Sequence, residues 1–175
     1  MTRYLPPLVF AVLGWAWVLV FPLGLTRLDA GELGAAAVEL GIAHPPGLPT
    51  FVTTRHLLSL LPMGDLAARL GFASVVAAAL SGALGVWLCL RVGRSLWAAV
   101  LVPLALLASP VFGLHATTIE VYADLPIVCV GALAATLRAR DGDARGLVAL
   151  GLLAGLSLGH HAELGLDGQR LCRHG

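Results

Sequence analysis

Three carboxylates and a histidine are concentrated in one short stretch of an otherwise apolar chain. The stretch is residues 28–47, LDAGELGAAAVELGIAHPPG, and it contains Asp29, Glu32, Glu39 and His44. A carboxylate beside a bound hydroxyl can take its proton as the oxygen attacks, so Asp29 is a candidate general base. We interpret the stretch as one wall of an active site at the outer side of a membrane.

The same residues have structural alternatives. Asp29 and Glu32 form the pattern D-x-x-E before a helical segment, which is also typical of a capping box. On a helix, Glu32, Ala36 and Glu39 share one face, and Leu33, Ala37 and Leu40 share the other. The first face is expected to be polar and the second apolar, so Glu39 is expected on a solvated helix face. His44 stands beside two prolines, so a role in the turn is the alternative to a role in binding.

A second polar cluster, HATTIEVYAD at residues 115–124, separates two later apolar runs. Its Glu120 and Tyr122 are candidate substrate-binding residues, because an acid at the edge of a membrane span is costly to keep. Anchoring of a helix at the membrane interface is the alternative, since tyrosine is common there.

The composition indicates an all-α membrane protein. Of 175 residues, 58% are hydrophobic and 12% are charged, whereas soluble domains average about 25% charged residues. Several apolar runs approach the length of about 20 residues that a spanning helix needs. The expected partner is therefore the lipid bilayer, and no basic tract interleaved with aromatic residues suggests nucleic acid.

We expect about five spanning helices and two short interfacial helices in the first outer loop. A bend is expected at Pro103 in the third span. A row of Gly151, Gly155 and Gly159 predicts close helix packing in the fifth. The expected spans are residues 4–25, 66–90, 96–113, 125–137 with flanks, and 147 to about 161; the interfacial helices are residues 29–43 and 48–61.

Arginine distribution predicts the orientation, because basic residues favour cytoplasmic loops. With a cytoplasmic N-terminus, six arginines lie inside, against three outside at positions 27, 55 and 69. This arrangement places residues 29–44 and 115–124 outside. We expect one transmembrane domain over residues 1–161, followed at 162–175 by an atypical tail, as in a truncated or frameshifted chain. Because adjacent helical residues point in different directions, His160 and His161 are expected to form an interfacial pair rather than a metal site.

The order of DAGEL, AHPPG and TIEVYA resembles the N-terminal part of bacterial membrane proteins related to protein O-mannosyltransferases. These proteins belong to the GT-C superfamily of glycosyltransferases. The resemblance covers roughly residues 5–161. It implies a many-helix enzyme of the bacterial plasma membrane that uses a polyprenyl-phosphate sugar as donor and a protein or envelope glycan as acceptor.

The resemblance also implies roles for individual residues. Asp29 takes the position of the general base or acceptor-positioning acid, with Glu32 about one turn further on. His44, Glu120 and Tyr122 match the following loop segments. No cofactor is certain, and the need for a divalent metal stays open.

Two arginines complete the candidate site. Arg27 and Arg55 are candidate partners for the donor phosphate, because guanidinium groups suit phosphate oxygens. Interfacial arginines also bind lipid headgroups, which is the alternative for both residues.

Two other functions are compatible with the sequence. A transporter or channel segment would place ionisable groups near the bilayer midplane, whereas these lie at span ends and in loops. A non-catalytic helical protein that assembles with other chains is the third hypothesis. Relatives in the resembling family continue through further spans, so this chain is expected to be a fragment too short to act alone.

Overall fold

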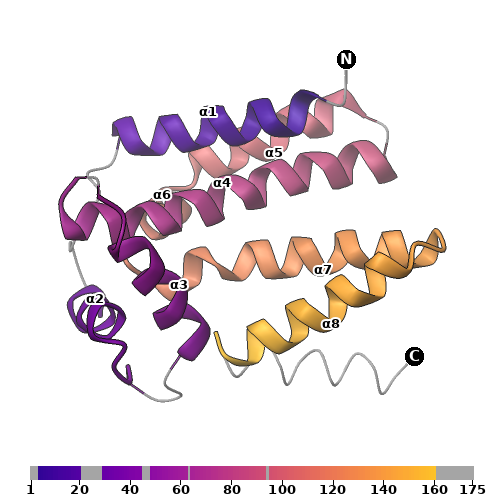
Figure 1. The fold of residues 1–175 in the computed structure, drawn as a ribbon. Coiled ribbons are helices and arrows are strands. Elements are labelled where there is room, and N and C mark those ends of the chain that lie inside the picture. Colours follow the sequence, from indigo (N-terminus) through magenta and orange to yellow (C-terminus); the bar gives the residue numbers. More distant parts are fainter. Residues whose placement is uncertain (1–3, 21–28, 45–47, 63, 94, 161–175) are drawn as a thin grey trace.

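The computed structural model describes residues 4–20, 29–44, 48–62, 64–93 and 95–160. Within these ranges every element is helical (Figure 1), which confirms the predicted all-α class. The elements are α1 Leu5–Val20, α2 Ala30–Glu39, α3 Pro49–Ser59, α4 Leu66–Val92, α5 Leu96–Ala108, α6 Pro110–Thr117, the 3₁₀ turn η2 Val121–Ala123, α7 Leu125–Arg140 and α8 Ala144–Leu158.

The long helix α4 is the centre of the bundle and packs against α1, α5, α6 and α7. Its small residues allow this close approach: Ser74 and Ala78 are fully buried. A Cβ at Gly82 would lie 2.3 Å from Leu13 Cδ1 of α1, so only glycine fits there. The row of small residues in α4 therefore brings α1 against it, as such rows do in membrane helices.

Among the described residues, fewer helices have the length of a span than the five predicted. By length and composition, two helical segments in these ranges can cross a membrane, Leu66–Val92 and Val121–Arg140, which have 27 and 20 residues. A third candidate is the pair Val100–Ala108 and Pro110–Thr117, which is bent by 81°. In the described parts of the chain, α1 and α8 are apolar but shorter, at 16 and 15 residues.

The third predicted span breaks at Ser109. Pro103, where the bend was predicted, lies inside the continuous helix α5. Ser109 has extended backbone angles, and its hydroxyl accepts a hydrogen bond from the Phe112 backbone N–H at 3.2 Å. Pro110 takes the first position of α6, where its missing N–H is not needed. A serine cap followed by proline thus starts a new helix, whereas Pro103 is tolerated within an apolar one.

Only one glycine of the predicted row in α8 makes a close contact. Cβ positions at Gly151 and Gly155 have no neighbour within 4 Å among the described residues, and both glycines are exposed. The third, Gly159, closely approaches Thr50 of α3. The helix approaches α7 at Gly146, where a Cβ would lie 2.5 Å from the Ala139 backbone nitrogen.

The amphipathic pattern of α2 is realised only in part. Leu33 and Ala37 are buried as predicted, but Ala36, which the pattern predicts on the polar side, is buried too. Leu40 is 56% exposed, although the pattern predicts it on the apolar side. Leu40 follows the last turn of α2 and ends the helix in the left-handed conformation, with φ 52°.

Candidate functional site

Both acid-bearing segments lie at the same end of the helix bundle (Figure 1). α2 and α3 pack together beside α4, and residues 118–124 connect α6 to α7 at that end. Ile119 and Val121 belong to the same buried apolar cluster as Leu33 of α2 and Phe51 of α3. The second polar segment therefore packs directly against the helices of the first.

Glu120 is the buried acid of this region. The residue is 4% exposed, and among the described residues its Oε1 has no hydrogen-bond partner. Burial raises the pKa of the Glu120 carboxyl, and the negative charge of Asp29 raises it further. A hydrogen bond from the Val121 backbone and the interaction with His44 lower it. Asp29 and His44 therefore both lie within electrostatic reach of Glu120.

Glu32 fixes the chain that follows α2. The backbone N–H of His44 donates to Glu32 Oε1 at 2.7 Å, and the imidazole Nδ1 lies 3.3 Å from the same oxygen. These contacts join residues 12 positions apart. We call Asp29, Glu32, His44 and Glu120 the acid cluster.

The capping-box alternative does not hold in the structure. Asp29 precedes α2, but its side chain makes no capping hydrogen bond, and its angles of φ −82° and ψ 4° are not the extended ones of a typical cap. Its backbone carbonyl accepts from the Leu33 N–H at 2.8 Å. Glu32 binds His44 instead of reaching back to Asp29. The Asp29 carboxylate is therefore exposed and not used to begin the helix.

Arg55, Asp124 and His160 form a largely buried polar group, which we call the buried network. Arg55 is 3% exposed, and its Nη2 donates to Asp124 Oδ2 at 2.9 Å and to Ser74 Oγ at 3.3 Å. His160 Nε2 lies 3.2 Å from the same Asp124 oxygen. The Arg55 guanidinium also lies 4.6 Å from the centre of the Phe51 ring. One carboxylate thus joins α3 to the ends of α7 and α8.

Two further contacts tie the buried network to the backbone of the site. Ser74 Oγ donates to the Thr118 carbonyl at 2.7 Å, two residues before Glu120. The Thr50 N–H at the start of α3 donates to the Gly159 carbonyl at 2.9 Å. A Cβ at Gly159 would lie 2.4 Å from Thr50 Oγ1, so glycine is needed for this approach. The end of α8 therefore holds α3 in place.

The remaining predicted site residues are not gathered in the acid cluster. Tyr122 is 49% exposed, and its ring meets His115 edge-on with a centroid distance of 5.2 Å. Arg55 contributes to the buried network, so in this arrangement its guanidinium is occupied by Asp124. Arg27 lies outside the described residues. No group of three or more potential metal ligands occurs in the described ranges.

Comparison with known proteins identifies the family of this chain. Residues 29–166 match the family described as the N-terminal domain of protein O-mannosyl-transferase TMEM260. The chain belongs to this family. Mouse protein O-mannosyl-transferase TMEM260 is 43% identical over 77 residues, which cover 41% of this chain and 11% of the mouse protein. No solved structure matches the chain.

The TMEM260 family match begins at Asp29 and includes the whole acid cluster and buried network. Two members of that network, Asp124 and His160, are absent from the predicted site. The prediction of an interfacial histidine pair is wrong for His160, which is 5% exposed and paired with Asp124; His161 lies outside the described residues. The one available signal was a histidine ending an apolar helix, where a polar group needs a partner.

A substitution at Glu120 tests its burial in this TMEM260 family member. Because the folded-state pKa of Glu120 is raised, the protein loses stability as pH rises from about 4 through that pKa. Glu120→Gln stays neutral, so we expect its unfolding midpoint at pH 7.5 to exceed that of the unaltered protein by about 2–4 °C. Thermal unfolding of the two proteins in detergent, at pH 7.5 and at about pH 4, measures the difference in unfolding midpoint. This difference should vanish near pH 4. A variant less stable at pH 7.5 would contradict the result.

Proposed function

We propose that the chain forms the N-terminal part of a membrane glycosyltransferase that transfers a sugar to a protein hydroxyl group. The observation that carries the proposal is that α2, which Asp29 precedes, and the segment of buried Glu120 lie at the same end of the bundle, where the charge of Asp29 also raises the pKa of Glu120. The mouse relative, a protein O-mannosyl-transferase by name, supports mannose as the sugar and protein as the acceptor. Envelope glycan is the alternative acceptor.

In the proposed reaction, the acceptor oxygen attacks the anomeric carbon of a polyprenyl-phosphate sugar. The hydroxyl proton passes to the Asp29 carboxylate, and the bond between sugar and phosphate breaks with its electron pair on the phosphate. Asp29 suits this role because its side chain is exposed and takes no part in capping α2. The reaction needs no further co-reactant.

The other members of the acid cluster position the reactants. Glu32 holds the His44 backbone, so the loop that carries the imidazole is fixed beside the acids. Glu120 has a raised pKa, which favours its neutral form and allows it to donate a hydrogen bond to a bound hydroxyl. Tyr122, half-exposed on the same segment, offers a surface for the sugar or the acceptor.

The donor phosphate needs a cationic partner as its charge develops. Arg27 remains the proposed partner from the first loop. Arg55 serves this role only if its guanidinium exchanges Asp124 for phosphate, so we assign it first to holding α3. A divalent metal is not required by this scheme.

We also propose that the chain crosses the plasma membrane of a bacterium five times, with its N-terminus in the cytoplasm. α1 and α8 expose large apolar side chains such as Trp15, Leu19 and Leu152, which suits contact with lipid. Arg91, Arg138 and neighbouring arginines gather at the end of the bundle away from the acid cluster. Their number favours that end as the cytoplasmic one.

The position of the acids at helix ends favours an enzyme over a transporter. Asp29, Glu120 and Asp124 precede α2, η2 and α7 respectively, so each lies at a helix end. Transport pathways place such groups near the middle of the bilayer.

A transfer assay tests the proposal. Membranes from cells that overproduce a longer protein carrying this chain as its N-terminal part would be given radiolabelled mannosyl polyprenyl phosphate and a peptide rich in serine and threonine. We expect label in that peptide and none in a matched peptide with alanine at every hydroxyl position. Absence of protein-dependent label, with mannosyl and other hexosyl donors alike, would refute transfer to protein.

A further inference from the structure

A pocket lies at the opposite end of the bundle from the acid cluster. Its volume is about 550 Å³, and it opens between the C-terminal ends of α4 and α7. One part of its lining is apolar and the other is charged. The lining residues are Leu84, Trp87 and Ala134 in the apolar part and Arg91, Arg138, Asp141 and Asp143 in the charged part.

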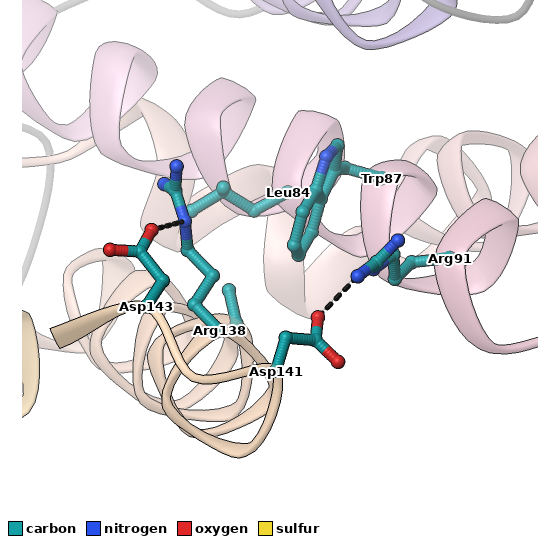
Figure 2. A pocket seen from close by; sticks show the side chains of 7 residues that line it. Leu84, Trp87, Arg91, Arg138, Asp141 and Asp143 are labelled. Atoms are coloured by element: carbon teal, nitrogen blue, oxygen red, sulfur yellow. Dashed lines mark hydrogen bonds and ion pairs between the residues drawn. The ribbon is translucent and has the colours of Figure 1, made fainter. Parts of the chain in front are cut away.

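Two ion pairs form the charged part of the pocket, and the Trp87 ring lies between them in the view of Figure 2. Arg91 pairs with Asp141, and Arg138 Nε lies 3.5 Å from Asp143 Oδ2. Their side chains are 37–57% exposed, so solvent reaches all four groups. Exposed ion pairs contribute only about 0–1 kcal/mol, and their partners can therefore be exchanged at little cost.

The pocket is at the depth of lipid headgroups if the bundle spans a membrane as proposed. It lies between the last turns of α4 and α7, the two helices long and apolar enough to cross. At 1.5 Å per residue, Leu84 lies roughly 10 Å before Arg91 along α4, toward the middle of the helix. Its apolar wall would therefore face acyl chains while the four charged groups face the headgroup layer, where tryptophan is also common.

We propose that this pocket binds one glycerophospholipid with a phosphoethanolamine headgroup. The guanidinium groups of Arg91 and Arg138 donate hydrogen bonds to the phosphate oxygens. The primary ammonium donates to the carboxylates of Asp141 and Asp143. An anionic headgroup without an amine would meet two carboxylates, and a trimethylammonium group has no hydrogen to donate.

Lipid retention measures this preference without reference to sugar transfer, so its failure and that of the proposed enzyme are separable. The full chain would be extracted from bilayers containing equal amounts of phosphatidylethanolamine, phosphatidylcholine and phosphatidylglycerol, and bound lipid weighed by native mass spectrometry. We expect phosphatidylethanolamine to be enriched about tenfold, which corresponds to about 1.4 kcal/mol. Equal retention of the three lipids, or preference for either of the others, would overturn the proposal.

Variants connect the preference to the pocket. The double variant Arg91→Gln and Arg138→Gln should lose the enrichment, whereas Arg145→Gln, an exposed arginine outside the pocket, should keep it. Asp141→Asn with Asp143→Asn should move the preference to phosphatidylglycerol; asparagine also caps helices, so α8 keeps its start. Equal unfolding midpoints in detergent would show that each variant folds. Enrichment that survives the double arginine change would refute this site.

Competition by a water-soluble headgroup compound distinguishes binding of a whole lipid from binding of a free phosphate compound. Glycerophosphoethanolamine lacks the acyl chains that would contact Leu84 and Trp87. Equimolar glycerophosphoethanolamine should therefore leave the bound lipid in place. Its displacement of the lipid would show that the apolar wall contributes nothing and would overturn a lipid site.

Discussion

Asp29→Asn is expected to lower sugar transfer by about 10²–10⁴-fold, the contribution typical of a positioned base. Asparagine has nearly the same shape but cannot take the acceptor proton. The fold should persist, because the Asp29 side chain makes no capping hydrogen bond and its backbone carbonyl provides the bond to Leu33. Initial rates of label transfer from mannosyl polyprenyl phosphate measure the loss.

Glu39→Gln is the matched control, since Glu39 is an exposed acid on the same helix. Its rate should remain within about twofold of the unaltered protein, as surface substitutions change little. Asp29→Asn should also lower the pKa of Glu120, because it removes a charge that raises it. Transfer by Asp29→Asn at the unaltered rate would remove Asp29 from the mechanism.

Asp124→Ala is expected to destabilise the protein by about 3–5 kcal/mol, the usual effect of breaking a buried ion pair. The substitution leaves the Arg55 guanidinium 3% exposed without its carboxylate partner and removes the contact to His160. α3 then loses its connection to α7. Unfolding in mixed micelles, followed by circular dichroism over increasing denaturant fraction, gives the free energy.

Asp141→Ala provides the comparison, because its partner Arg91 is exposed and such pairs contribute about 0–1 kcal/mol. The combined change Arg55→Met and Asp124→Leu should recover part of the loss, since an apolar pair leaves no uncompensated charge. If Asp124→Ala were no more destabilising than Asp141→Ala, the buried network would not be holding the site together.

The local parts of the fold were predictable from the sequence. The two helices that can span a membrane, α4 and α7, fall on predicted apolar runs, and short helices occupy both predicted positions in the first loop. Local chemistry also explains where the third predicted span breaks, because Ser109 caps α6 and Pro110 takes its first position. The number of spans is less accessible, since in the described parts of the chain α1 and α8 have 16 and 15 residues, fewer than the roughly 20 that a span needs.

For the candidate site as well, some residues could be predicted from the sequence and some contacts could not. Asp29, Glu32, His44 and Glu120 were identifiable because each belongs to a short motif beside a span. The pairing of Arg55 with Asp124 joins residues 69 positions apart, and no local pattern specifies such a contact. The D-x-x-E pattern predicted a capping box as well as a base, and only the distant contact of Glu32 with His44 separates the two interpretations.

The docking of the end of α8 on α3 has a consequence for how the protein is made. Ribosomes deliver the chain from its N-terminus, and the early segments can fold as they emerge. Yet the Thr50 N–H gains its carbonyl partner only when Gly159 has been synthesised, and Asp124 gains its contact with the imidazole only when His160 has been added. The start of α3 therefore gains its contact with Gly159 only after more than a hundred later residues have been synthesised. In a nascent chain, α3 therefore lacks its contacts with the end of α8 until α8 has been synthesised.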